Sequence, residues 1–162
     1  MDIFIEQLYE MQPTVSALLK KAGLIAVGSI LIFILLFVAL FIFPGFASIF
    51  FLLAAGVGYF AYILCGKLNV EYEYILTGGI VDIDRITNRK SRKRILSFNC
   101  ADINGIGSVE RVPQGREVKY FCSKDDGKYF SLGDKIIVFA PNERFKEELK
   151  KSLPRHLKKE LD

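Results

Sequence analysis

The longest apolar stretch of the chain runs from residue 22 to residue 66 and contains no Asp, Glu, Lys, Arg or His. Pro44 and Gly45 interrupt this stretch near its middle. A helix rises about 1.5 Å per residue and a bilayer core is about 30 Å thick, so one span needs about 20 apolar residues. The pattern predicts a transmembrane hairpin over residues 20–66, with spans at about 23–43 and 46–65.

The charges that flank the hairpin predict its orientation. Lys20 and Lys21 precede the first span, Lys67 follows the second, and the turn between the spans carries no charge. Because positive residues are retained in the cytoplasm, we expect a multi-pass protein of the cell membrane with both termini cytoplasmic. A cleaved signal peptide is disfavoured, since the apolar run is too long and an acidic segment precedes it. The spans contain no ionisable residue, which disfavours a channel or transporter acting alone and favours an anchor.

Small residues recur at helical spacing in both spans. Such residues let helix backbones approach closely, and close packing drives helix association in lipid. We expect these stripes to join the two spans, and a contact between two copies of the chain is the alternative. The predicted helix-packing residues are Ala22, Ala26, Ser29, Ala54, Gly58, Ala61 and Cys65.

Residues 1–19 have a pattern typical of an amphipathic helix. Phe4, Leu8 and Met11 repeat at intervals of four and three, while Asp2, Glu6 and Glu10 fall on the opposite side. Since an acidic polar face suits anionic lipid poorly, packing against the cytoplasmic domain or a partner is at least as favoured as a position in the membrane interface.

From Asn69 onward the apolar period changes from helical to two. Val70, Tyr72, Tyr74 and Leu76 alternate with more polar residues, which predicts a strand. Gly78-Gly79 is a two-residue hairpin signal. Turn residues then divide the chain into about seven short strands up to residue 140, which is typical of a small barrel or sandwich. One of these turns is Asp125-Asp126-Gly127.

A single amphipathic helix follows the strands. Pro141-Asn142 is a helix-capping signal, and Phe145, Leu149 and Leu153 recur every fourth residue among charges. We therefore expect a cytoplasmic β domain with a C-terminal helix over residues 69–155, followed by a charged tail over 156–162.

The chain has a formal net charge of +4, and one short segment concentrates positive charge. The segment lies between the second and third expected strands. It is interpreted as a solvated loop that helps to set topology, as a contact with anionic inner-leaflet lipid, or as a site for an acidic protein. Nucleic acid is the weakest alternative, because no aromatic platform accompanies the charge. The basic residues are Arg85, Arg89, Lys90, Arg92, Lys93 and Arg94.

The sequence offers no strong catalytic or metal-binding pattern. Asp82 and Asp84 share one side of a strand, which is more typical of a solvated face than of a metal or acid–base site. His156 is the only histidine, and Cys65, Cys100 and Cys122 form no Cys-x-x-Cys pair. We expect no catalytic residues, no bound metal and no cofactor.

Three segments resemble bacterial pleckstrin-homology-like (PH-like) membrane proteins. They are residues 72–77 after the second span, residues 95–103, and residues 136–142 leading into the helix. More narrowly, Tyr72-Glu73-Tyr74, Gly79, residues 82–86 and the basic run resemble an uncharacterised two-span family of mostly Gram-positive bacteria. The resemblance implies a seven-stranded PH-like barrel or sandwich capped by a helix, and no activity. The first hairpin loop is short and uncharged and the chain has no Trp, so phosphoinositide binding is not implied.

We therefore expect a non-enzymatic, membrane-anchored binding or scaffolding module. Its cytoplasmic domain would meet a protein partner or the anionic inner leaflet, and self-association stays open. The alternative is an accessory subunit of a larger membrane transport or envelope complex that interacts through its hairpin.

Overall fold

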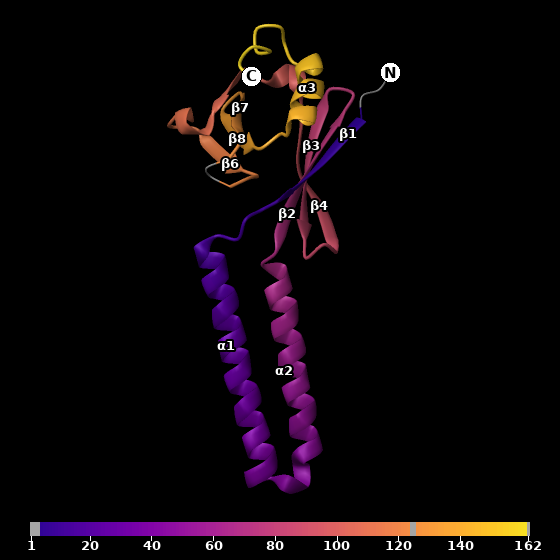
Figure 1. Ribbon diagram of the computed structural model, residues 1–162, viewed down its shortest axis with the longest axis vertical. Coiled ribbons are helices and arrows are strands. Elements are labelled where there is room, and N and C mark those ends of the chain that lie inside the picture. The colour runs from indigo at the N-terminus through magenta and orange to yellow at the C-terminus, as the bar shows by residue number, and fades with distance from the viewer. Residues whose placement is uncertain (1–3, 124–125, 162) are drawn as a thin grey trace. The chain divides into compact units, whose positions relative to one another are not determined.

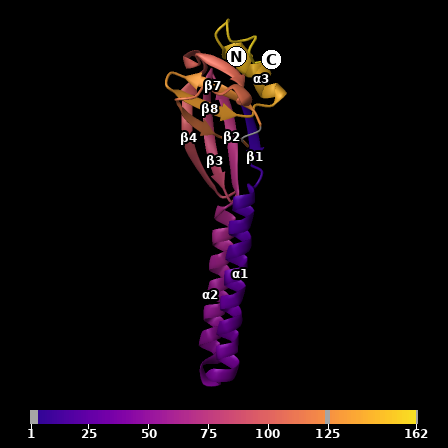
Figure 2. The ribbon, with the colours of Figure 1, turned by 90° about the vertical axis from the view of Figure 1, so that its left-hand side faces the viewer.

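The computed structural model describes residues 4–123 and 126–161, and Figures 1 and 2 show its elements. Asp2, Asp125 and Asp162, each part of a segment interpreted above, lie outside the described residues. The chain divides into two compact units. A helical unit spans residues 13–69, and a β unit combines residues 1–12 with residues 70–162. The helical unit is thus inserted into the sequence of the β unit.

The helical unit is a hairpin of two long helices. Helix α1 (Val15–Phe37) continues as a π-helical turn η1 (Val38–Ile42), and a 3₁₀ turn η2 (Pro44–Phe46) leads into α2 (Ala47–Lys67). Both helices are long and apolar enough to cross a membrane. The first begins at Val15, directly after Pro13 and Thr14, so it extends further toward the N-terminus than the span expected at residue 23.

The β unit contains two four-stranded sheets in the described residues. Sheet A has the order β1-β2-β3-β4 with antiparallel neighbours, and sheet B has the order β5-β7-β8-β6, in which β6 and β8 are parallel. The strands are β1 (Phe4–Glu10), β2 (Val70–Thr77), β3 (Ile80–Thr87), β4 (Ser91–Asn99), β5 (Gly105–Ser108), β6 (Glu117–Tyr120), β7 (Lys128–Leu132) and β8 (Lys135–Phe139). About seven strands were expected after the hairpin; the described residues there form seven, β2 to β8, and β1 adds an eighth.

The amphipathic helix expected over residues 1–19 is wrong for residues 4–10, which form strand β1, whereas residues 15–19 are helical as the start of α1. Ile5, Gln7 and Tyr9 face inward at a period of two. Ile5 is only 6% exposed, the Gln7 side chain donates to the Ala140 carbonyl and accepts from the Asn142 amide, both at 2.8 Å, and Tyr9 stacks on Tyr74. These contacts with distant residues favour the strand over the local helical pattern.

The hairpin expected at Gly78-Gly79 is confirmed. Both glycines have positive φ, +56° and +86°, as a two-residue turn between twisted antiparallel strands requires. The β3–β4 turn uses the same backbone region at Asn88 and Arg89, each with φ +54°. This conformation is uncommon for a residue with a side chain; the Arg89 side chain forms ion pairs with Glu10 and Glu71.

The core of the β unit lies between the two sheets and the C-terminal helix α3 (Glu143–Ser152). Tyr74, Phe130, Phe139 and Phe145 are fully buried in it, and the buried Tyr74 hydroxyl donates to the Phe121 carbonyl at 2.7 Å. The expected cap is confirmed, since the Asn142 side chain accepts from the Phe145 amide.

Residues 156–161 are part of this core and not a separate charged tail. Leu157 is 2% exposed and Leu161 is fully buried, although charged side chains surround them in sequence. Removing two leucines from water is worth about 3–6 kcal/mol, so the domain extends to residue 161 at least.

Candidate functional site

The outer face of sheet A, the side that points away from the core, carries a dense set of charges. Alternate residues of an antiparallel strand share a face, and directly paired residues lie on the same face. The register aligns Leu8, Glu73, Asp84 and Arg94 in one row across the four strands. The carboxylates that this face gathers are Glu6, Glu10, Glu71, Glu73, Asp82 and Asp84.

Arg92 lies among the carboxylates of all three neighbouring strands. Its Nε donates to Asp84 Oδ2 at 2.9 Å, its Nη2 lies 3.4 Å from Glu6 Oε1, and it also pairs with Glu73. The Asp84 side chain is only 7% exposed. Charge-assisted hydrogen bonds to a nearly buried carboxylate are among the stronger ones, so Arg92 has a structural role in sheet A.

Arg94 and Arg89 complete this network. Arg94 pairs with Asp82 at 3.0 Å and with Asp84 at 3.3 Å, and Arg89 pairs with Glu10 and Glu71 at 2.9 Å each. Three guanidinium groups thus face six carboxylates. Half of the predicted basic patch is therefore paired on a face that is acidic overall.

Glu73 shows how crowded the acidic side chains are. Burial raises its pKa above the ordinary value, and Glu6 and Asp84 add to the rise while Arg92 opposes it. The buried Glu73 Oε2 and Asp82 Oδ1 accept no hydrogen bond, although the Glu73 oxygen lies against Arg92. Two carboxylate oxygens on this face thus lack a hydrogen-bond donor, and burial makes the charged form of Glu73 costly.

The rest of the basic run lies elsewhere. Arg85 follows the buried Ile83 by two residues and pairs across the strands with Lys93, so both lie on the inner-face side of sheet A. Lys90 lies in the β3–β4 turn. All three are exposed and make no ion pair with any described residue. Their contact with lipid or a partner stays a prediction.

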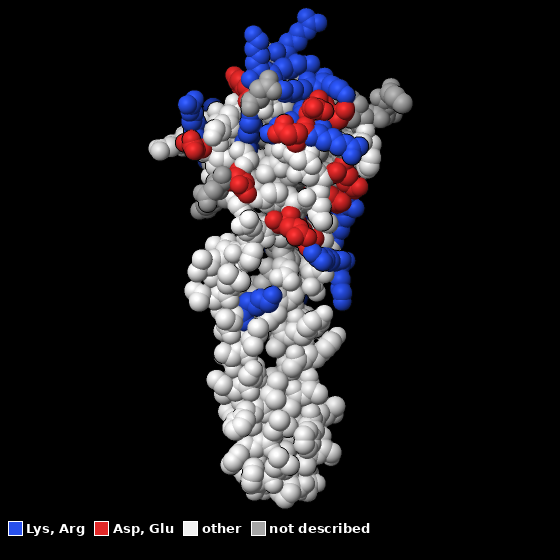
Figure 3. All heavy atoms as spheres, viewed as in Figure 1, with Lys and Arg blue, Asp and Glu red and all other residues white. Residues whose placement is uncertain are grey.

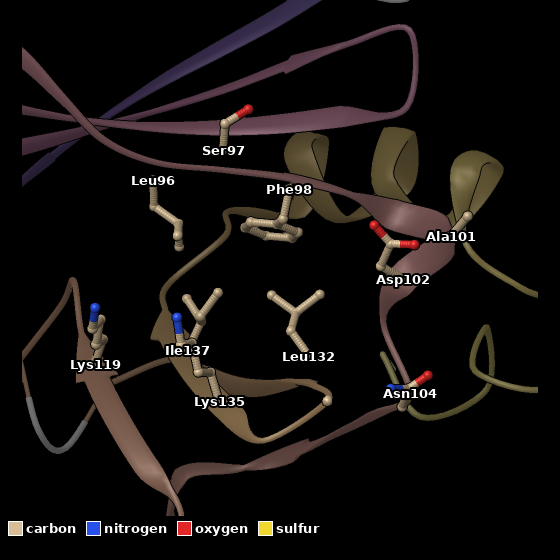
Figure 4. A pocket seen from close by; sticks show the side chains of 11 residues that line it. Leu96, Ser97, Phe98, Ala101, Asp102, Asn104, Lys119, Leu132, Lys135 and Ile137 are labelled. Carbon is tan, nitrogen blue, oxygen red and sulfur yellow. The ribbon is translucent and has the colours of Figure 1, made fainter.

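A groove of about 570 Å³ opens between β4 and sheet B. Figure 4 shows Leu96 and Phe98 of β4 pointing toward Leu132 and Ile137 of the β7–β8 hairpin. These four side chains form an apolar floor. Leu96, Phe98 and Leu132 are half-buried in the structure as described, so their apolar surface is available to a ligand.

Charged side chains line the rim of the groove unevenly. Lys119 of β6 and Lys135 of β8 lie on one side of it, and Asp102 and Asn104 lie on the other (Figure 4). Lys119 also pairs with Glu117 at 3.3 Å, with both side chains about half exposed. Exposed pairs of this kind are worth only about 0–1 kcal/mol, so the Lys119 ammonium group can leave Glu117 and pair with another carboxylate.

Sequence reasoning missed this groove. Its lining comes from three separate segments of the chain, residues 96–104, Lys119 and residues 132–137, and no local pattern marks these segments as one surface. One signal was present: Lys119 and Lys135 precede Phe121 and Ile137 by two residues each, and so share a strand face with buried residues.

The reactive residue types are dispersed. The described residues contain no group of three or more His, Cys, Asp and Glu side chains placed to hold a metal ion. Burial raises the pKa of Cys100 to about 11 and that of Cys122 to about 12, so both thiols are unreactive at neutral pH. His156 is exposed. Asp82 and Asp84 bind Arg94.

The two predicted stripes of small residues differ in how far they are buried between the helices. On α2, Ala54 is 6% exposed and Gly58, Ala61 and Cys65 are partly buried. On α1 the residue in tight contact is Gly28, where an added Cβ would lie 3.4 Å from Ala61 Cβ. The α1 stripe is not at this contact, since Ala22, Ala26 and Ser29 are exposed; the actual contact face of α1 lies about one residue further round the helix.

Comparison with known proteins bears on this architecture. Neither the curated proteins nor the solved structures gave a match. One family, described as Bacterial PH-like domain (DUF6106), matches residues 1–159 and thus both units, including strand β1. The two-span PH-like resemblance expected from the sequence is confirmed, and the chain belongs to this bacterial PH-like domain family.

Proposed function

We propose that the protein is a non-enzymatic, membrane-anchored binding module whose PH-like domain meets a protein partner at the cytoplasmic face of the cell membrane. The observation that carries this proposal is the insertion of the helical hairpin between β1 and β2. These strands pair from Phe4–Thr77 to Glu10–Glu71, so the chain leaves and re-enters the domain at one end of sheet A. An N-terminal truncation that removes this hairpin therefore also removes β1 from the sheet.

The proposed orientation rests on charge. Lys20 and Lys21 precede the apolar part of α1, and Lys67 ends α2. Figure 3 shows the helical unit white apart from its lysines, while Lys, Arg, Asp and Glu side chains are scattered over the visible face of the β unit. Because positive residues stay in the cytoplasm, the hairpin enters the membrane from that side and the β unit remains there.

Contact with anionic lipid is a second part of this proposal. Lys90, Arg85 and Lys93 lie toward the end of sheet A at which Val70 begins β2, and only two residues separate Val70 from α2 in the sequence. Each basic residue near an anionic bilayer surface adds about 1 kcal/mol. In nanodiscs, hydrogen exchange of residues 88–93 should slow in anionic but not in neutral lipid, and salt should abolish the difference. Equal exchange in both lipids would remove lipid contact from the proposal.

A crosslinking experiment in native membranes tests the binding function. A photoreactive amino acid replaces one exposed residue at a time in the full chain: Leu8 on the outer face of sheet A, Lys135 at the groove, and Glu147 on α3. Gly45 in the hairpin turn serves as the control position. We expect at least one position of the β unit, and not Gly45, to give a discrete adduct with another protein. Adducts only with lipid or with a second copy at all three positions would contradict the proposal.

The alternative, an accessory subunit that associates through its hairpin, is favoured by one observation. Ala22, Ala26 and Ser29 form an exposed stripe of small residues on α1, as helix interfaces in membranes often do. Under this alternative, Ala26→Leu should abolish co-purification with a membrane partner and leave the protein folded. Gly28→Leu, by contrast, should destabilise the hairpin itself, because Gly28 packs against Ala61. Unchanged association of the Ala26→Leu protein would exclude the stripe as an interface.

A further inference from the structure

We propose that the free edge of β4 and the groove beside it bind an extended protein segment that carries an apolar side chain and, two residues away, a carboxylate. This inference rests on the proposed binding function and names its site and the chemistry of its partner. The occupant is a strand of another protein.

The edge of β4 offers backbone groups to such a strand. β4 lies at the end of sheet A and pairs only with β3 among the described strands. Natural proteins protect edges of this kind with charged residues. The first half of β4 is protected by Arg92, Lys93 and Arg94, but residues 95–99, Ile-Leu-Ser-Phe-Asn, carry no charge. The unprotected half is the one that borders the groove.

The groove gives a place for one side chain of the added strand. In a strand added to β4, alternate side chains point to the same side as Leu96 and Phe98. There they would contact the apolar floor, which Leu132 and Ile137 complete (Figure 4). A volume of about 570 Å³ is ample for one large apolar side chain. Burying such a side chain removes its apolar surface from water, which favours binding.

Charge complementarity selects the neighbouring side chain. Lys119 and Lys135 lie at the rim of the groove, and Lys93 lies on the same face of β4 beyond Leu96. The opposite end of the groove carries Asp102. A carboxylate on the partner is therefore favoured toward the lysines and disfavoured toward Asp102. Since side chains on one face of a strand are two residues apart, the apolar residue and the carboxylate are expected at positions i and i+2.

The free backbone edge favours a protein strand over a single-chain anionic amphiphile such as a fatty acid. An amphiphile would use the apolar floor and the lysines but would leave the edge of β4 unpaired. A strand uses all three features. Backbone hydrogen bonding at residues 95–99 is therefore the property that separates the two occupants.

The test uses the full chain in nanodiscs, because residues 68–162 alone lack β1. A displayed library of random 12-residue peptides is selected for binding, and a selected peptide is measured against three proteins. These are the wild type, the double variant Lys119→Glu/Lys135→Glu, and Lys159→Glu, a matched exposed lysine away from the groove. Hydrogen exchange of residues 95–99 is followed with and without the peptide, and lauric acid is tested as a competitor.

We expect selected peptides to share an apolar residue and Asp or Glu at i+2. The double variant should bind on the order of tenfold more weakly or worse, the Lys159→Glu protein should bind as the wild type does, and residues 95–99 should be protected from exchange. Equal peptide binding by the double variant and the wild type would overturn the inference. So would protection from exchange at α3 or β1 in place of residues 95–99. So would lauric acid binding that depends on Lys119 and Lys135 without protection of β4.

The two proposals fail differently. If crosslinks to another protein arise from Leu8 or Glu147 but not from Lys135, and no peptide binds at the groove, the site inference is wrong and the binding function survives. If no position of the β unit crosslinks to another protein, the binding function itself fails.

Discussion

The two faces of sheet A carry basic side chains from one run of the sequence, yet these side chains have different surroundings. On the outer face, Arg92 and Arg94 bind the nearly buried Asp84 and its acidic neighbours. On the inner-face side, Lys93 and Arg85 are exposed and make no ion pair with a described residue. Lys93 lies between Arg92 and Arg94 in the sequence, and only the pleat of the strand places it on the opposite face.

A run of charge along a strand is therefore not the same as a charged patch on the surface. A pleated strand distributes consecutive residues to opposite faces, and the neighbouring strands decide which of them are neutralised. Six basic residues within ten positions thus divide into three that stabilise sheet A and three that remain available for a ligand. The predictions below test this division.

The largest effect is expected where β1 meets the core. Ile5→Ala should lower the free energy of unfolding by about 2–4 kcal/mol, because Ile5 is 6% exposed and packs in the core. Phe4→Ala, on the outer face and 64% exposed, should change it by less than about 0.5 kcal/mol. Chemical denaturation of the full chain in detergent measures both. A larger loss for Phe4→Ala than for Ile5→Ala would restore the amphipathic helix and contradict the strand.

The next effect compares neighbours on β4. Arg92→Gln should cost about 1–2 kcal/mol, since it leaves Glu73 without its guanidinium partner and Asp84 with Arg94 alone. The expected loss of stability is no larger than this because the Arg92 side chain is about half exposed, so solvent screens its ion pairs. Lys93→Gln should cost less than about 0.5 kcal/mol. Thermal unfolding of the two variants at equal salt concentration is the measurement. Equal losses for both variants would show that the outer-face network does not stabilise the sheet.

The smallest effect concerns pH. The pKa of Glu73 is raised in the folded protein, mainly by burial, so the folded state binds this proton more tightly than the unfolded state does. The stability that Glu73 contributes is present below its unfolded pKa and is lost as the pH rises through its folded pKa. Relative to Glu73→Gln, the wild type should therefore lose stability as the pH is raised from 4 to 7. A difference between the two proteins that moves the other way would contradict the burial of Glu73.

Much of the fold was predictable because its signals are local. The charge-free stretch with Pro44-Gly45 gave the hairpin, Gly78-Gly79 gave the first turn of sheet A, and Asn142 gave the start of α3. These features depend on the residues of one short segment and on the period of its apolar positions. The local pattern at the N-terminus was ambiguous, since Phe4 and Leu8 fit a helix while Ile5, Gln7 and Tyr9 fit a strand. The partner of β1 lies beyond the whole hairpin.

The candidate site was less predictable because it depends on register and on distant contacts. The sequence identifies Arg92 as basic, but only the alignment of β1, β2 and β3 brings Glu6, Glu73 and Asp84 to it. In the same way, Phe98 and Lys135 become neighbours in a groove only through the packing of two sheets. Residues that contribute to such a surface carry no special spacing in the chain.

The membrane topology of the hairpin can be measured directly by labelling single cysteines in intact cells. Cys65→Ser removes the thiol of α2, and Cys100 and Cys122 are buried with raised pKa values, so the background labelling is low. Gly45→Cys in the turn and Lys90→Cys in the β3–β4 turn are then treated with a membrane-impermeant maleimide. With both termini in the cytoplasm, Gly45→Cys should react in intact cells and Lys90→Cys should react only after permeabilisation. Labelling of Lys90→Cys in intact cells would contradict this topology.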